Sequence, residues 1–391
     1  MKNIARNSKF NIDVNFKKSS GSYLFDNRTQ RKYLDFFGMY ASLPLGYNHK
    51  VFKTEEFKTE ILTASTFKLN NCEFISKETI DFDKEFVKFV NDNYYKNFHY
   101  ACTGALAVEA AIKTCIHKSG YKNPNIVSFK NSFHGINSLS GFVTDRFWPA
   151  NNKLSGLPQD FSTKLNCELN EVEHYLKRNF VTCVLVEPIQ CSAGDIHHET
   201  AFFVGLRYLC DKYNIPLVFD EIQVGFGGTG KLWYYQHTGI NPDIVIFGKK
   251  TQLSGIMVNN KYSGIFNRDS ITRLEATWDG NVLDMIRCKY IIKAYNRYNI
   301  VKNAKERGDT LLNNLKKIKG IENPRGKGLI VGFDLNSSEK RDIFFDRLYS
   351  NGFLSNKTGK KSIRLRPALS INDYTILKGV DIIRKTLEEI K

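Results

Sequence analysis

The chain has 391 residues, of which 57 are lysine or arginine and 40 are aspartate or glutamate, so its net charge is +17 at neutral pH. Hydrophobic residues make up 42% and charged residues 25%, which excludes a disordered or collagen-like chain. No run approaches the roughly 20 apolar residues of a membrane span, and the first ten residues contain no apolar stretch typical of a secretion signal. We therefore expect a cytoplasmic protein without a membrane partner.

Neither the cysteines nor the excess of positive charge points to a particular ligand. The eight cysteines are scattered, without a CxxC pair or histidines at zinc-ligand spacing, so we expect reduced thiols and no metal site. Basic residues run along the whole chain without a block of five or six, and a nucleic-acid footprint should cluster. We therefore interpret the positive charge as a compositional bias and expect no nucleic-acid partner. A basic nucleic-acid-binding or scaffold protein is the alternative.

Taken in chain order, the apolar patterns predict a large α/β unit between two smaller segments. Turn residues around Asn27 and Arg28 predict a hairpin between residues 22–26 and 31–36. Helical periodicity covers 104–119 and 201–213, and these segments alternate with short apolar runs that predict buried strands at 125–129, 182–186, 216–219 and 243–247. Strands that alternate with helices predict a mostly parallel sheet covered on both faces.

Helical patterning dominates towards the C-terminus. It predicts helices over 291–298 and 303–318, strands at 329–333 and 362–365, and a terminal helix from about Asn372. We predict that both termini fold together into a small α+β domain, with residues 1–60 as its N-terminal part and 296–391 as its C-terminal part. The large domain is then 61–295.

Chemistry-bearing residues follow the predicted strands, where open α/β sheets bind their ligands. Gly104 and Ala105 open a helix, whose free N–H groups suit a phosphate, although the same residues also form ordinary helix caps. Asp220 follows a buried strand and can pair with a protonated heterocyclic nitrogen; a metal ligand or a helix cap is the alternative.

Two further strings follow neighbouring strands. Gly248 precedes Lys249 and Lys250, and desolvation at a strand end lowers the pKa of a lysine enough for Schiff-base chemistry; a solvated lysine pair is the alternative. Phe133, in the string SFHG at 132–135, offers an aromatic face to a planar ring, although core packing explains such a residue equally well.

The order and spacing of these features resemble the class III aminotransferases, a family of fold type I that depends on pyridoxal 5′-phosphate. The strings FGKKTQ at 247–252 and LEATWDGN at 274–281 are similar to those of the L-lysine 6-aminotransferases within it. The resemblance runs from about Gly21 to the C-terminus. It implies an α/β fold and the transfer of a terminal (omega) amino group from an amine donor to a 2-oxo acid such as 2-oxoglutarate, by a ping-pong mechanism.

The resemblance also assigns roles around the cofactor ring. Lys249 would bind the cofactor covalently, with Lys250 as the alternative, and strand periodicity and the interval from Asp220 favour Lys249. Asp220 would keep the ring nitrogen protonated. Gln223 would hydrogen-bond the phenolic oxygen of the ring, and Phe133 would stack on the ring face.

Further residues are implied for the phosphate and the acceptor. Gly104 and Ala105 would bind the phosphate from one subunit, and Thr277 would reach it from the partner, so the resemblance implies a homodimer with shared active sites. Arg364 would grip a dicarboxylate acceptor through a bidentate pair.

Three positions depart from the family pattern and bear on the substrate. Ser192 stands where a second glutamate usually follows the string at 187–191, and Ile136 where lysine aminotransferases have an arginine that binds the substrate carboxylate. Glu275 replaces an asparagine. Losing such an arginine costs about 1.5–3 kcal/mol of binding. We expect a donor other than free L-lysine, such as a cationic or modified amine that meets Glu275; compensation by neighbouring residues is the alternative.

Other chemistry on the same cofactor, such as racemisation, mutation or decarboxylation, is the alternative function. Arg364 favours transamination over these reactions, because it suits a dicarboxylate acceptor. A basic protein that keeps the fold without the chemistry is the second alternative, and the presence of Lys249, Asp220 and Thr277 argues against it.

Overall fold

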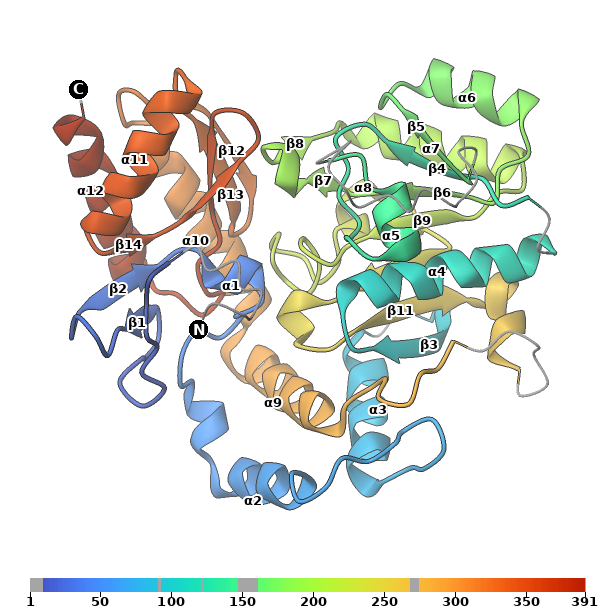
Figure 1. The fold of residues 1–391 in the computed structure, drawn as a ribbon, viewed down its shortest axis with the longest axis horizontal. Coiled ribbons are helices and arrows are strands. Elements are labelled where there is room, and N and C mark those ends of the chain that lie inside the picture. The colour runs from blue at the N-terminus through green and yellow to red at the C-terminus, as the bar shows by residue number, and fades with distance from the viewer. Residues whose placement is uncertain (1–9, 91–92, 121–122, 147–160, 268–273, 391) are drawn as a thin grey trace, which may run out of the picture.

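The computed structural model describes residues 10–90, 93–120, 123–146, 161–267 and 274–390. They form two lobes, one built on a seven-stranded sheet and one on two smaller sheets, with α9 between them (Figure 1). Among the helices of the described ranges, none combines the length and apolar character of a membrane span. The first nine residues, part of the segment that shows no secretion signal, lie outside the described residues.

The large sheet has the strand order β3-β11-β10-β9-β6-β4-β5. Its strands are β3 (Tyr95–Ala101), β4 (Ile126–Phe129), β5 (Ser162–Leu165), β6 (Cys183–Val186), β9 (Leu217–Asp220), β10 (Ile244–Phe247) and β11 (Ser254–Asn259). Neighbours from β5 to β10 pair in parallel, whereas β11 is antiparallel to both β10 and β3. The predicted mostly parallel sheet is confirmed.

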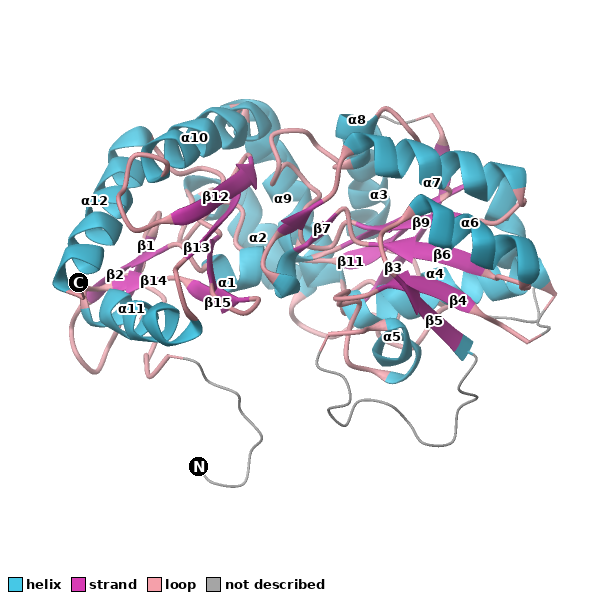
Figure 2. Cartoon of the chain, turned by 90° about the horizontal axis from the view of Figure 1, so that it is seen from above, coloured by secondary structure: helices cyan, strands magenta, loops and turns pink. Residues whose placement is uncertain are grey.

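Helices cover both faces of this sheet, as Figure 2 shows for α4 and α5 on one side and α6 and α7 on the other. Successive strand residues therefore point into different apolar layers: Val218 packs with residues of α4, whereas Phe219 packs with Phe203 of α7. The helices of this lobe are α3 (Lys77–Val90), α4 (Gly104–Ser119), α5 (Ser138–Val143), α6 (Leu169–Arg178), α7 (Thr200–Lys212) and α8 (Tyr235–Thr238).

Strands β3, β5 and β11 were not predicted. β3 reads YKNFHYA and β5 reads STKL, so neither is a continuous apolar run of the kind that marks a buried strand. Their pairing with inner strands compensates for the weak pattern, since tertiary context overrides local propensity. The four predicted inner strands and the helices at 104–119 and 201–213 are confirmed within one or two residues.

The second lobe joins both ends of the chain. The predicted hairpin, β1 (Tyr23–Phe25) and β2 (Lys32–Asp35), is confirmed, and β2 pairs in parallel with β14 (Phe353–Leu354) near the C-terminus. A second, antiparallel sheet has the order β12-β13-β16-β15. Its strands are β12 (Glu322–Lys327), β13 (Ile330–Asp334), β15 (Asn356–Thr358) and β16 (Ser362–Leu365).

The helices of this lobe are α9 (Val282–Tyr298), α10 (Ile300–Leu315), α11 (Ser338–Ser350) and α12 (Asp373–Glu389). Side chains cap the starts of α9 and α12: Asn281 accepts from Leu283 N before α9, and Asn372 accepts from Thr375 N before α12. The domain boundaries at residues 60 and 295 stay predictions, and the second would fall inside α9.

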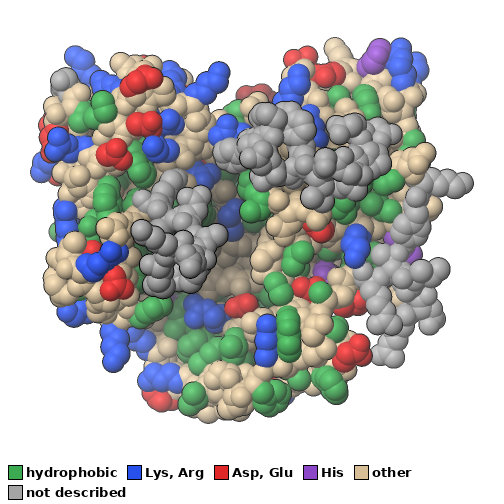
Figure 3. All heavy atoms as spheres, in the orientation of Figure 1, with side chains coloured by type: hydrophobic (Ala, Val, Ile, Leu, Met, Phe, Trp, Pro, Cys, Tyr) green, Lys and Arg blue, Asp and Glu red, His purple; other side chains and the backbone are tan. Residues whose placement is uncertain are grey.

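Short elements complete the described chain. Near the N-terminus lie α1 (Gly38–Ala41), η1 (Lys50–Lys53) and α2 (Glu55–Ala64), and around the large sheet lie β7 (Ile189–Gln190), η3 (Cys191–Ala193), β8 (Ile196–His197), η4 (Lys249–Thr251) and η5 (Asn260–Phe266). On the face in Figure 3, lysine and arginine side chains are scattered among acidic ones over both lobes.

Candidate active site

A pocket of about 370 Å³ lies at the carboxyl ends of the strands of the large sheet. Eight residues singled out in the sequence line it: Gly104, Ala105, Phe133, Ile136, Ser192, Asp220, Gln223 and Lys249. Because β4, β6, β9 and β10 are adjacent and parallel, the residues that follow them reach the same edge. The fold thus collects residues that lie more than 140 positions apart in the sequence.

Asp220 ends β9 and is 6% exposed. Its Oδ2 lies 2.8 Å from Nδ1 of His134, and its Oδ1 accepts from the backbone N–H of Ile222 at 3.1 Å. These two contacts hold the carboxylate in one orientation at the floor of the pocket. No ligand cluster of three or more His, Cys, Asp or Glu occurs among the described residues, and the metal-ligand reading of Asp220 finds no support there.

Lys249 and Lys250 diverge after β10. Lys249 lines the pocket with Asp220, whereas Lys250 is 2% exposed and donates from Nζ to the backbone oxygen of Gln223, outside the lining. Burial lowers the pKa of Lys249, and the charge of Asp220 opposes that shift. Lys249 also has φ of +54°, in the left-handed region that non-glycine residues seldom adopt, and such strain occurs at functional sites.

Glu187 follows β6 and reaches the pocket wall, where its Oε2 accepts from the backbone N–H of Phe133 at 2.7 Å. Burial raises the pKa of Glu187 well above its usual value, and the negative charge of Asp220 adds to the effect. Glu187 therefore holds its proton more tightly than an exposed glutamate, and its carboxyl group ties the Phe133 loop to the strand edge.

Gln223 connects the pocket to two arginines of β16 and the residues after it. Its Oε1 accepts from Nε of Arg366 at 3.2 Å and from Nη1 of Arg364 at 3.5 Å. Arginine only donates, so the amide oxygen faces the arginines and the NH₂ group is left for the pocket. Arg364 is buried, its Nη1 also donates to the oxygen of Cys191 at 3.0 Å, and its Nε has no partner among the described residues.

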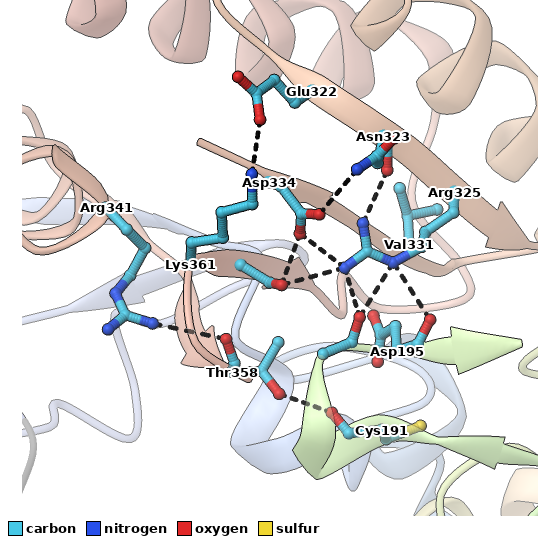
Figure 4. Close-up of polar contacts among 12 residues, drawn as sticks. Cys191, Asp195, Glu322, Asn323, Arg325, Val331, Asp334, Arg341, Thr358 and Lys361 are labelled. Atoms are coloured by element: carbon cyan, nitrogen blue, oxygen red, sulfur yellow. Dashed lines mark hydrogen bonds and ion pairs between the residues drawn. The ribbon is translucent and has the colours of Figure 1, made fainter. Parts of the chain in front are cut away.

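The loop at residues 191–195 carries Ser192, and side chains of the second lobe hold it through hydrogen bonds and an ion pair. Arg325 donates from Nε to the backbone oxygens of Gly194 and Asp195 and pairs with Asp334 (Figure 4). Thr358 donates to the backbone oxygen of Cys191 at 2.7 Å, and Arg366 pairs with Asp195 at 2.5 Å. The position of this pocket wall therefore depends on how the two lobes pack.

Of the three residues that depart from the family pattern, two line the pocket and one lines another cavity. Ile136 lines the pocket and is 60% exposed, and Ser192 lines it with an Oγ that is buried and lacks a partner among the described residues. Glu275 lines another cavity, with His99 and Asp279, and Thr277 is exposed. Within one chain, the fold therefore does not bring Thr277 and Glu275 to the pocket.

Three contacts at the site were not predicted: those of His134, Glu187 and Arg366. His134 and Glu187 lay inside strings already noted, at 132–135 and 187–191, and Arg366 directly follows the predicted strand at 362–365. The signal that could have found Glu187 and Arg366 is a charged residue directly after a buried strand, and His134 stands next to Phe133 in the loop after β4.

This fold and this pocket define a class of protein. The family model of the class-III aminotransferases matches residues 4–387. The chain belongs to that family, and it is a transaminase that uses pyridoxal phosphate.

Individual relatives narrow the comparison. L-lysine-epsilon aminotransferase of Mycobacterium tuberculosis is 29% identical, over 96% of this chain and 92% of that protein. A [LysW]-aminoadipate semialdehyde/glutamate semialdehyde transaminase of Sulfolobus acidocaldarius is 31% identical, over 96% and 95%. The structure of lysine aminotransferase from M. tuberculosis in its internal aldimine form superposes with a TM-score of 0.89 at 26% identity, covering 99% of this chain and 97% of that one.

The residues at the pocket fit pyridoxal phosphate. The first turn of α4 offers backbone N–H groups for the phosphate. Gly104 lets this turn lie close to Ile222, since a Cβ there would lie 2.9 Å from Cδ1 of Ile222. Asp220 supplies a fixed carboxylate for a ring nitrogen, Phe133 an aromatic face, and Lys249 an amine.

The raised pKa of Glu187 predicts a pH-dependent stability for the chain without cofactor. Unfolded glutamate titrates near pH 4.3, so the unfolded chain releases this proton at a lower pH than the folded one. The stabilisation is complete below about pH 4 and is lost as the pH rises towards the folded pKa. Glu187→Gln mimics the protonated form and should gain stability relative to wild type between pH 5 and 7.5, by up to about 1.4 kcal/mol per pH unit.

Urea unfolding at both pH values measures this difference. Glu199→Gln, a substitution at an exposed glutamate before α7, is the matched control and should leave the difference flat. An equal offset between Glu187→Gln and wild type at the two pH values would contradict the raised pKa.

Proposed function

We propose that this chain transfers a terminal amino group from an amine donor to a 2-oxo acid, with Lys249 as the lysine that binds the cofactor. The observation that carries the proposal is the shared pocket of Lys249 and Asp220, at the ends of adjacent parallel strands. The similarity to lysine-epsilon aminotransferases supports a terminal amine rather than an α-amine as donor.

The residues divide the work as follows. When bound, pyridoxal phosphate supplies an aldehyde that condenses with amines and a ring that takes up the electron pair left when a proton leaves the substrate carbon. Asp220 accepts a hydrogen bond from the protonated ring nitrogen, and Gln223 donates its NH₂ group to the ring oxygen. Lys249, with its lowered pKa, takes a proton from the substrate carbon and returns it as general base and acid.

Two half-reactions follow from these roles. In the first, the amine donor leaves as an aldehyde or ketone; in the second, a 2-oxo acid such as 2-oxoglutarate accepts the amino group, which makes the cycle ping-pong. Arg364 is the guanidinium for a carboxylate of the acceptor, because it is buried near the pocket and forms no ion pair with a carboxylate among the described residues.

The chain works as a homodimer in this proposal. Exposed apolar side chains at Phe67, Phe74 and Ile75 lie beside the segment that carries Thr277, since Lys68 Nζ is 4.4 Å from the centre of the Trp278 ring. Hydrophobic side chains are also exposed over α2 and α3 in Figure 3. A second copy that covers this surface would deliver Thr277 and Glu275 to the pocket of the first.

The eight cysteines all lie in the described residues, and each is a free thiol. We infer a reducing compartment such as the cytoplasm, where thiols stay reduced.

Lys249→Ala should abolish covalent cofactor binding and lower activity by several orders of magnitude, because the attachment point and the proton carrier disappear together. Borohydride reduction of the wild-type enzyme, followed by peptide mapping, should label Lys249. Lys250→Ala is the matched control and should still be labelled at 249. A label on Lys250 in the wild type would shift the assignment by one residue.

The donor preference tests the substrate. The pocket has Ile136 where an arginine would hold the carboxylate of lysine, so we expect free L-lysine to be a poorer donor than diamines or modified lysines. The assay is glutamate formation from 2-oxoglutarate. Ile136→Arg should raise kcat/KM for L-lysine roughly tenfold. Ile136→Met is the control of similar length and should not. Fast lysine turnover by the wild type would overturn the expected preference.

The dimer makes a separate prediction. Phe74→Asp combined with Ile75→Asp should lower the sedimentation coefficient to that of a monomer and weaken cofactor binding, because two charges enter a surface that must lose its water. Tyr374→Asp, at a residue of α12 that is 74% exposed, is the matched control and should stay dimeric. A wild-type enzyme that is monomeric while active would contradict the shared site.

A further inference from the structure

Lys250 is a buried lysine that the proposed chemistry does not use. It is 2% exposed, and among the described residues no ion pair joins it to a carboxylate. Its ammonium group donates to the backbone oxygen of Gln223. Burying a lone ammonium is unfavourable, and an apolar side chain would fill the same space without that penalty. The hydrogen bond to Gln223 is therefore the contact that explains why a lysine is buried at this position.

The backbone at Gln223 needs such a partner. Gln223 lies in the turns between β9 and α8, where the chain has left the sheet and no strand pairs with it. Gln223 is held at both ends: Lys250 binds its backbone oxygen, and Arg364 and Arg366 bind its side-chain oxygen. This arrangement leaves the NH₂ group of the side chain to face the pocket.

We propose that Lys250 is a positioning residue, which fixes the main chain at Gln223 so that its amide NH₂ meets the ring oxygen of the cofactor. This inference rests on the proposed function, since it takes Lys249 as the attachment point and Gln223 as the partner of the ring oxygen. Lys250 acts through Gln223 and does not itself touch the cofactor.

The side chains that bind Gln223 are positively charged, which affects the oxygen that its NH₂ group would meet. Three cationic side chains, those of Lys250, Arg364 and Arg366, surround the amide, and together they favour a negative oxygen next to its NH₂ group. Burial lowers the pKa of Lys250 to about 7, helped by the charges of Lys249 and Arg366 and opposed by Cys191 and Glu221. The arginines keep their protons at all relevant pH values. Lys250 is thus the cation of the three whose charge changes near neutral pH.

Lys250→Met in the full-length holoenzyme is the test. It removes the donor and the charge at similar length. Dialysis against pyridoxal phosphate should show affinity weakened roughly tenfold, the loss typical of a charged hydrogen bond. The absorbance of the bound cofactor changes with pH, and the midpoint of that change should move to higher pH. Removing a nearby positive charge makes protonation of the nitrogen at Lys249 more favourable, which raises its pKa.

A double-mutant cycle separates positioning from general packing. In a Gln223→Ala background, Lys250→Met should weaken cofactor binding no further, because there is no side chain left to position. Additive losses of affinity would overturn the inference. Unchanged affinity in Lys250→Met alone would overturn it as well.

Two controls keep the result interpretable. Borohydride labelling of Lys249 in both enzymes distinguishes the two ideas: an unlabelled Lys249 in the wild type defeats the proposed function, whereas labelled Lys249 with an unchanged affinity defeats the role of Lys250 alone. If Lys250→Met does not fold, Gly228→Ala replaces it. A Cβ there would lie 2.8 Å from Cε and 2.9 Å from Nζ of Lys250, so it displaces the ammonium without removing its charge, and the same loss of affinity is expected.

Discussion

The parallel pairing of β9 with β10 is the constraint on which the site depends. Asp220 is the register partner of Ile246, so the chain leaves both strands at the same edge of the sheet, and Asp220 and Lys249 enter one pocket. Because the strands are buried on both faces, a slip of one residue would turn apolar side chains to the wrong layer. The core packing of the sheet thereby holds the chemistry in place.

Burial has opposite consequences for the charged groups around this edge. Asp220 is buried with a histidine partner, and burial raises the pKa of Glu187 well above its usual value. Lys249 loses proton affinity for the same reason. A single low-dielectric pocket thus holds a carboxyl group with raised proton affinity, a fixed carboxylate and a lysine with lowered proton affinity, which are groups suited to proton transfer.

The second lobe shapes the pocket without lying at its floor. Arg364 and Arg366 reach across from the region of β16 to Gln223, and Arg325 holds the backbone of the 191–195 loop. The guanidinium groups of these arginines stay charged and donate hydrogen bonds to backbone and amide oxygens. These bonds fix the position of the 191–195 loop and the orientation of the Gln223 side chain. The position of Ser192 in the pocket wall therefore depends on residues far from it in the sequence.

The sequence by itself determined the inner strands, the flanking helices and the residues that follow each strand, because apolar periodicity and the groups at strand ends are local signals. Strand periodicity and the interval from Asp220 favour Lys249, but Lys250 stays the alternative because both follow the same strand. The turn after β10 separates the two side chains: Lys249 lines the pocket, whereas Lys250 reaches the backbone oxygen of Gln223. The polar strand β3 and the grip of Arg325 on the 191–195 loop likewise arise from contacts between distant segments, which leave no periodic trace in the chain.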